Sequence, residues 1–120
     1  MTPKVLIIED DDDLRRLYNT SLGIAGFRVE EAPNGLDALR RIDTERPDAV
    51  VLDLGLPFIS GVTVCQDLAA RSSTRHIPIV VVTGSKEDLD WLEVSCVLRK
   101  PVSPERLAAA LWDCLGKKPS

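Results

Sequence analysis

In the stretch "VLIIEDDDDLRR", residues 5–16, four apolar residues run directly into five consecutive acids. Two like charges about 4 Å apart repel each other by roughly 4 kcal/mol near a protein surface. A buried strand that ends in five carboxylates therefore needs a structural reason. Either the acids spread into solvent, or some of them hold a cation.

The length and charge of the chain limit what it can be. With 120 residues, 44% of them hydrophobic and 28% charged, it suits one globular domain with a single core. The net charge of −4, without a basic block, argues against nucleic acid or an anionic membrane surface as a direct partner. No apolar run is long enough to span a membrane. We therefore expect one domain over residues 1–120, with no effector domain.

The cysteines indicate the compartment. Cys65, Cys96 and Cys114 are odd in number and widely spaced, and each lies in an apolar-periodic segment. This usage is typical of reduced, core-facing thiols in a cytoplasmic protein rather than of disulfides or a metal site.

Short apolar runs recur along the chain and predict buried strands. The five runs cover residues 5–8, 27–32, 49–52, 77–83 and 96–98. They are continuous rather than alternating, which is typical of a parallel sheet covered on both faces.

Between the strands, apolar residues repeat at steps of three and four, which predicts helices. The clear helical segments cover residues 14–25, 36–42, 62–69 and 107–115. Residues 84–95 must hold one further, short helix and its two connections. This strict strand-then-helix order predicts an α/β fold, an open doubly wound parallel sheet of five strands flanked by five helices, the fourth of them short.

Polar residues end four of the five predicted strands. The first strand ends in Glu9 and Asp10, the third in Asp53, the fourth in Thr83 and the fifth in Lys100. In doubly wound sheets the ligand site lies outside the carboxyl ends of the strands, so these side chains should meet at one edge. The second strand runs into "EEAPNG" and is not expected to contribute.

The residue types at this edge predict a particular chemistry. Glu9, Asp10 and Asp53 offer hard oxygen ligands without histidine or cysteine, which suits Mg²⁺. A carboxylate beside Mg²⁺ can also be the nucleophile of a phosphoryl transfer. Lys100 and Thr83 would then supply positive charge and a hydrogen-bond donor to the phosphoryl oxygens.

Four motifs, in this order and at this spacing, resemble those of the receiver domains of two-component response regulators. They are "IIEDD" (7–11), "VVLDLGLPFISG" (50–61), "VVVTGS" (80–85) and "RKPV" (99–102). The resemblance covers essentially the whole chain. It implies a flavodoxin-like sheet with strand order 2-1-3-4-5 and a phosphorylatable switch with Asp53 as the phospho-acceptor.

The resemblance also implies how the metal would be bound. Asp10 and Asp53 would be direct Mg²⁺ ligands, and Glu9 would act largely through water. Gly55 would contribute its backbone carbonyl.

The same resemblance implies the partners and the course of the reaction. Thr83 and Lys100 would bind the phosphoryl group, with the Lys100–Pro101 bond in the cis form. The phosphoryl group would come from a histidine kinase or a histidine phosphotransfer protein and would later be hydrolysed. The chain would therefore be a self-phosphorylating and self-dephosphorylating switch rather than an enzyme acting on an external substrate. Its output would pass through a downstream protein partner.

The sequence departs from the family pattern on the output side. The fifth strand of the family usually carries an aromatic residue that moves inward when phosphorylation draws the fourth-strand hydroxyl toward the phosphoryl group. Here the position is Val97, which is short and stiff at χ1. We therefore predict that rearrangement of residues 84–91 carries the signal.

Two alternatives remain open from the sequence. A degenerate receiver would act as an unphosphorylated interaction module, although no site position is substituted. A flavodoxin-type electron carrier would need a phosphate-binding loop after the first strand, where the acids at 9–13 would repel a phosphate. The chain could also be a domain excised from a larger protein.

Overall fold

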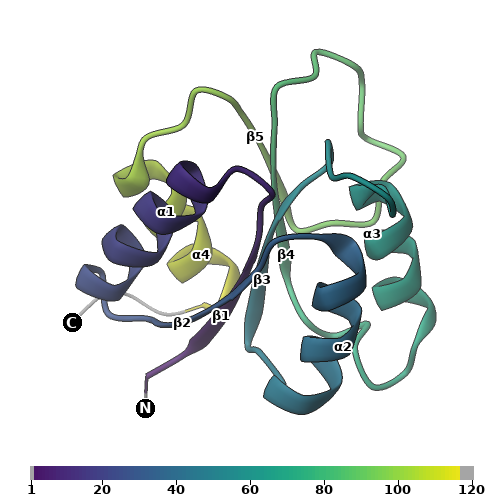
Figure 1. Cartoon of the computed structure of the whole chain (residues 1–120), viewed down its shortest axis with the longest axis horizontal. Helices are drawn as coiled ribbons and strands as arrows, with labels where there is room; N and C mark the ends of the chain where they lie inside the picture. The colour runs from purple at the N-terminus through teal and green to yellow at the C-terminus, as the bar shows by residue number, and fades with distance from the viewer. Residues whose placement is uncertain (1, 117–120) are drawn as a thin grey trace.

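The computed structural model describes residues 2–116, which form five strands and four helices. The elements are β1 (Lys4–Ile8), α1 (Asp12–Ile24), β2 (Arg28–Ala32), α2 (Gly35–Glu45), β3 (Ala49–Asp53), α3 (Gly61–Ala70), β4 (Ile79–Thr83), β5 (Cys96–Arg99) and α4 (Pro104–Cys114) (Figure 1). All strand pairs are parallel, in the order β2-β1-β3-β4-β5. The predicted α/β sheet and its strand order are confirmed. The ends of the expected domain, residues 1 and 117–120, lie outside the described residues.

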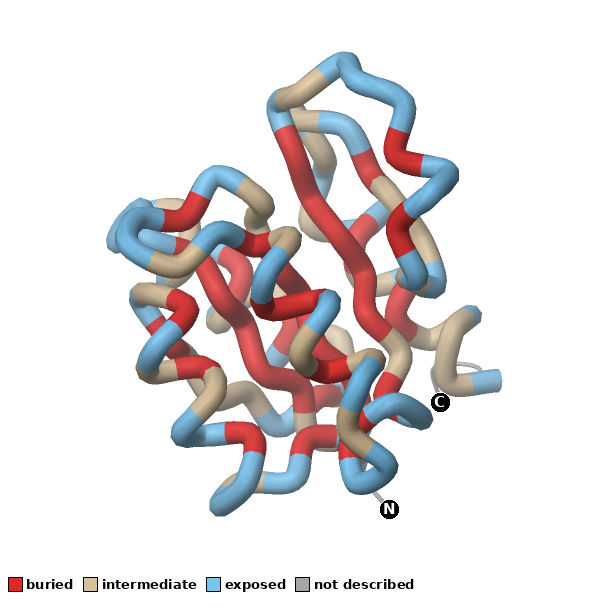
Figure 2. The backbone as a smooth tube through the Cα atoms, turned by 90° about the vertical axis from the view of Figure 1, so that its right-hand side faces the viewer, coloured by how far each residue is buried: buried red, intermediate tan, exposed pale blue. Residues whose placement is uncertain are grey.

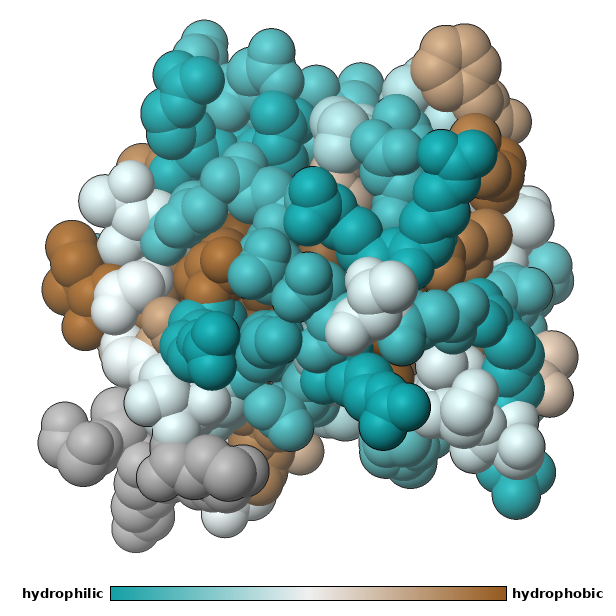
Figure 3. Space-filling model, turned by 60° about the horizontal axis from the view of Figure 1, so that its bottom comes forward, coloured by the Kyte–Doolittle hydropathy of each residue, from teal (hydrophilic) through white to brown (hydrophobic). Residues whose placement is uncertain are grey.

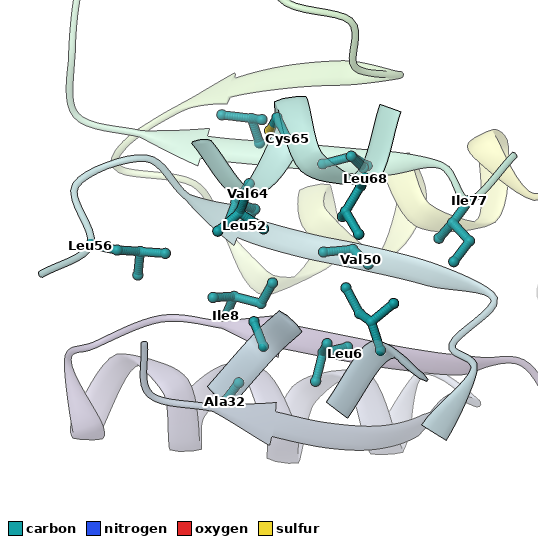
Figure 4. Packing of buried hydrophobic residues seen from close by; sticks show 14 of the residues in the cluster. Leu6, Ile8, Ala32, Val50, Leu52, Leu56, Val64, Cys65, Leu68 and Ile77 are labelled. Atoms are coloured by element: carbon teal, nitrogen blue, oxygen red, sulfur yellow. The ribbon is translucent and has the colours of Figure 1, made fainter. Parts of the chain in front are cut away.

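The sheet separates two helical layers, with α1 and α4 on one face and α2 and α3 on the other (Figure 1). Side chains alternate along β1, so Val5 and Ile7 pack under α1 and α4, while Leu6 and Ile8 pack under α2 and α3. Figure 4 shows the second of these cores, and Figure 2 shows that the central strands are buried along their length. Burial on both faces explains why the sequences of the central strands β1, β3 and β4 are almost continuously apolar.

Every helix in the described range begins at a side-chain cap that the sequence supplies. The capping oxygens belong to Asp11, Asn34, Ser60 and Ser103. Each accepts a hydrogen bond from a backbone N–H of the first turn, which contributes about 1 kcal/mol. Two of the five acids, Asp12 and Asp13, lie in the first turn of α1, where the helix dipole favours negative charge.

The prediction of a fifth helix within residues 84–95 is wrong. This segment is an irregular connection between β4 and β5, which stands out at the top of Figure 1. Its polar side chains bind nearby backbone instead of leaving it free for a helix. The Ser85 hydroxyl accepts from the Glu87 N–H at 3.1 Å, and the Asp88 carboxylate accepts from the Asp90 N–H at 2.9 Å. Such local bonds compete with helix formation.

The connection is nevertheless attached to the body of the protein. The guanidinium of Arg99 donates to the carbonyls of Ser85 and Glu87 at 2.6 and 2.7 Å. Leu89 and Leu92 are buried. The segment is therefore held at its start by β5 and along its second half by apolar contacts.

The prediction of reduced, core-facing cysteines is confirmed only in part. All three are free thiols, and Cys65 is buried in the core between the sheet and α3. Cys96 and Cys114 are half-buried at the edge of the other core. No helix within residues 2–116 combines the length and apolarity needed to cross a membrane.

Candidate functional site

The register of the sheet brings the acidic residues together. Ile8 at the end of β1 pairs with Leu52 of β3, so the next residues, Glu9 and Asp53, lie side by side at the carboxyl edge of the sheet. β1 and β3 are the neighbours at which the strand order changes direction, which is where doubly wound sheets form their sites.

The other two predicted residues follow from the neighbouring strands. Thr83 ends β4, which pairs with β3, and Lys100 comes directly after β5. The Lys100 N–H donates to the Thr83 carbonyl at 2.8 Å, which continues the ladder one step past β5. The Lys100–Pro101 peptide bond is cis, as the resemblance implies.

Three carboxylates form a cluster that fits a hard cation. One oxygen each from Glu9, Asp10 and Asp53 lies within 4.8 Å of the others. Mg²⁺ binds oxygen at about 2.1 Å, so two of its ligands lie at most about 4.2 Å apart. The spacing of the three carboxylate oxygens is therefore close to that of ligands around one ion. The donor set has no nitrogen or sulfur and therefore fits Mg²⁺.

Lys100 lies between two of these acids. Its Nζ is 3.2 Å from Glu9 Oε1 and 3.4 Å from Asp53 Oδ2. Partial burial lowers the pKa of Lys100, but the negative charges of Asp53 and Glu9 outweigh this effect and leave the pKa raised. The ammonium is therefore charged and placed where a group on Asp53 would meet it.

Glu9 is the carboxylate of the cluster whose negative charge is most strongly disfavoured by burial. It is 2% exposed, and burial raises its pKa to about 7. The N–H of Asp11, which donates to Glu9 Oε2 at 3.2 Å, opposes this shift, and the negative charge of Asp53 adds to it. A cation at the cluster would relieve both the burial and the repulsion.

The loop after β3 fits closely around Asp53. The Gly55 N–H donates to Asp53 Oδ1 at 3.0 Å, and the role of the Gly55 carbonyl stays a prediction. At Gly61 a Cβ atom would lie 2.5 Å from Leu54 Cα and 2.6 Å from the Asp53 carbonyl oxygen. Only glycine allows α3 to start this close to the acid.

Thr83 is poised to donate a hydrogen bond. Its side chain is buried, and its Oγ1 accepts from the Ser85 N–H at 3.1 Å. A hydroxyl has one proton to donate in addition to its lone pairs. The bond from Ser85 uses a lone pair, so the proton is left for a ligand oxygen.

Comparison with known proteins agrees with this arrangement. The family model described as response regulator receiver domain matches residues 5–112. The chain belongs to this family.

Relatives of the receiver domain are found among curated proteins and solved structures. This chain is 33% identical over 114 residues to the alkaline phosphatase synthesis transcriptional regulatory protein PhoP of Bacillus subtilis. The alignment covers 91% of this chain and 47% of PhoP. The chemotaxis response regulator CheY4 of Vibrio cholerae has a TM-score of 0.88 at 25% identity, covering 95% of this chain and 99% of CheY4. The receiver domain of the sensor histidine kinase PA1611 from Pseudomonas aeruginosa, solved with a magnesium ion in its active-site cleft, shares the fold. Its TM-score is 0.88 at 24% identity, covering 98% of this chain and 100% of that chain.

The receiver domain spans about half the length of the curated relatives it matches, 48% of a transcriptional regulator from Porphyridium aerugineum and 47% of PhoP. The similarity therefore covers the receiver part of those proteins. What this receiver domain controls is a separate question.

Two residues near the site were missed by sequence reasoning. Arg15 of α1 and Glu31 of β2 form an ion pair of 2.8 Å, and Arg15 Nη1 also donates to the Glu9 carbonyl at 2.9 Å. The second strand therefore does contribute to the site, through Glu31. An arginine one helical turn after a capping acid was the available signal, but its contact with a backbone carbonyl leaves no mark in the sequence.

Proposed function

We propose that the receiver domain takes a phosphoryl group onto Asp53 from the phosphohistidine of a histidine kinase or a histidine phosphotransfer protein, in a Mg²⁺-dependent reaction. The observation that supports this most strongly is the placement of the Asp53 carboxylate. It lies next to a charged lysine and in one cluster with two further carboxylates suited to a metal. That combination provides a nucleophile, a cation site and positive charge at one point.

The residues of the chain have distinct tasks in this reaction. A carboxylate oxygen of Asp53 attacks phosphorus, the bond between phosphorus and the histidine nitrogen breaks, and the imidazole leaves with a proton from solvent. Lys100 and the Thr83 hydroxyl then contact the phosphoryl oxygens, where they stabilise developing negative charge. Later attack by water on phosphorus releases inorganic phosphate and restores the carboxylate.

The metal would be held by Asp10 and Asp53, with Glu9 acting through water and Gly55 through its carbonyl. When bound, Mg²⁺ neutralises charge on the transferring group. Lys100 now pairs with Glu9 and Asp53, so it would exchange part of this pairing for the phosphoryl group.

The output is proposed to pass to a downstream protein partner through residues 84–91. Thr83 ends β4 immediately before this segment, and the Ser85 N–H is bonded to the Thr83 hydroxyl oxygen. A movement of the hydroxyl toward a phosphoryl group would therefore pull on Ser85 and on the two carbonyls held by Arg99.

The experiment is incubation of the protein with acetyl phosphate, with Mg²⁺ or with a chelator, followed by intact-mass analysis. We expect one phosphoryl group per chain with Mg²⁺ and little or none with the chelator. An unchanged mass in the presence of Mg²⁺ would instead favour the degenerate, unphosphorylated module. Equal phosphorylation with Mg²⁺ and with the chelator would show that the reaction does not need the metal.

A further inference from the structure

Arg15 joins three parts of the chain next to the acidic cluster. Its Nε donates to Glu31 Oε1 at 2.8 Å, its Nη2 to Asp12 Oδ1 at 2.6 Å and its Nη1 to the Glu9 carbonyl at 2.9 Å. Its side chain is only 14% exposed. A guanidinium presents several donors in one rigid plane, whereas an ammonium is a single point charge. The three contacts therefore require arginine.

Glu31 holds Arg15 in this orientation. One oxygen of Glu31 accepts from Arg15, and the other accepts from the Asn19 side-chain amide. Both donors lie on α1, while Glu31 is the residue before the end of β2. The carboxylate therefore ties the first turns of α1 to the neighbouring strand.

The result is that the main chain of Glu9 is fixed from two sides. Its N–H donates to the Ala32 carbonyl at 3.2 Å, and its own carbonyl accepts from Arg15. Asp10 follows directly and is exposed in the bend between β1 and α1. The position of the Asp10 carboxylate therefore depends on how firmly the Glu9 peptide is held.

We propose that Arg15, oriented by Glu31, is a positioning residue that holds the turn between β1 and α1 in the geometry needed to bind Mg²⁺. The inference rests on the proposed function, since it assigns a task toward the same metal. Arg15 touches neither the metal nor the phosphoryl group. It acts through the Glu9 peptide, and the loss of such a supporting contact typically weakens metal affinity by about 10–100-fold.

The test compares two arginines of the same receiver domain by Mg²⁺ titration calorimetry. Arg71 also donates three side-chain hydrogen bonds, in its case all to carboxylates, two to Asp67 and one to Asp43, at the far end of α3. Arg15→Ala should raise the Kd for Mg²⁺ by about 10–100-fold. Arg71→Ala should leave the Kd within about twofold of the wild type, because the hydrogen bonds of Arg71 go to Asp67 and Asp43 rather than to the turn between β1 and α1, and distant sites behave independently.

Two further readouts separate positioning from general stability. In the metal-free protein, the amides of residues 10–12 should exchange hydrogen faster in Arg15→Ala and at the wild-type rate in Arg71→Ala. Labelling by acetyl phosphate should need more Mg²⁺ in Arg15→Ala but reach nearly the wild-type rate at saturation. Glu31→Gln keeps an acceptor for Arg15 while losing its charge, so it should fold and show a smaller rise in Kd of the same sign.

The outcomes distinguish this inference from the proposed function. If the wild type binds Mg²⁺ and is labelled, but Arg15→Ala and Glu31→Gln have the wild-type Kd, the positioning role is wrong and the proposed function stands. The same holds if Arg71→Ala weakens binding as much as Arg15→Ala does. If the wild type itself shows no Mg²⁺ binding, the proposed function and the positioning role fall together.

Discussion

Glu9 is the residue at which charge and burial conflict most strongly. Its pKa is raised to about 7 in the folded, metal-free protein, from about 4.5 in the unfolded chain. The folded state therefore binds this proton more tightly than the unfolded state does. The resulting stabilisation is fully present below about pH 4.5 and is lost as the pH rises to about 7.

We predict that metal-free wild type loses stability relative to Glu9→Gln as the pH rises from 4.5 to 7. The change should be at most about 3 kcal/mol, at 1.36 kcal/mol per unit of pKa. Denaturant unfolding of both proteins at several pH values measures it. A difference between the two proteins that stays constant with pH would contradict the role given to burial.

Asp10 tests the acidic cluster as a metal site. Mg²⁺ should raise the Tm of the wild type more than that of Asp10→Asn, because a cation that binds the folded state stabilises it and Asp10 is proposed as one of its ligands. Asp13→Asn is the control, since Asp13 lies in the first turn of α1 and outside the cluster. It should keep the wild-type response. If Mg²⁺ raised the Tm of all three proteins equally, the acidic cluster would not be a specific metal site.

Gly61 tests how closely the backbone packs behind Asp53. In a helix, glycine to alanine normally stabilises by about 1 kcal/mol. At Gly61 we predict the opposite, a loss of about 1–3 kcal/mol, because the added Cβ would meet Leu54 and the Asp53 carbonyl oxygen. Thermal unfolding measures it. Gly84→Ala is the control, since a Cβ there has no heavy atom within 4 Å. A wild-type Tm for Gly61→Ala would show that the loop after β3 can move to make room for the added Cβ.

At the scale of elements, the connection between β4 and β5 is the part proposed to carry the output. Trp91 is 60% exposed, and its indole N–H donates to the Asp88 carbonyl at 3.0 Å. We predict that beryllofluoride, as a mimic of the phosphoryl group, changes Trp91 fluorescence. The measurement uses a Trp112→Phe background, in which the stack on Phe27 can persist.

Val97 gives the matched control for this element. It packs against the core between the sheet and α3, so Val97→Ala should lower stability while the Trp91 signal persists. If the signal is unmoved by beryllofluoride while partner binding still responds, another face of the molecule carries the output.

Most of the secondary structure could be predicted from the sequence, and the exceptions have physical causes. The strands and four helices were predictable because apolar residues and capping side chains mark them directly. Residues 84–95 were assigned a helix from length and order alone, and the bonds made by Ser85 and Asp88 overrode that assignment. Leu17 follows the three- and four-residue repeat of apolar residues in the segment 14–25, but it is 49% exposed. Tyr18 and Leu22 face the sheet, and Leu17 lies about 100° away from Tyr18 around the helix.

The candidate site was predictable for a different reason. Its residues follow from one rule about where doubly wound sheets place their ligands, and strand register alone brings Glu9 beside Asp53. The pairing of Arg15 with Glu31 follows no such rule, because it joins residues 16 apart through side chains whose meeting depends on how α1 lies on β2.

At the scale of the whole molecule, the receiver domain has one five-stranded sheet with the acidic cluster and Lys100 at its carboxyl edge. On the face shown in Figure 3 most of the surface is hydrophilic, and hydrophobic residues appear as separate patches. The large exposed hydrophobic side chains, among them Ile24, Phe58 and Trp91, belong to different segments. Phosphorylation would replace the single negative charge of the Asp53 carboxylate with a phosphoryl group that carries about 1.5 to 2 negative charges, in a chain of net charge −4. Such a change at one point is large enough to alter its neighbours.

Intact-mass analysis of three proteins after incubation with acetyl phosphate and Mg²⁺ tests Asp53 as the acceptor. Asp48→Asn is the control, because Asp48 lies just before the opposite end of β3 and is exposed. We predict that the wild type and Asp48→Asn each gain the mass of one phosphoryl group, and that Asp53→Asn gains none. A phosphorylated Asp53→Asn protein would contradict the assignment of the acceptor.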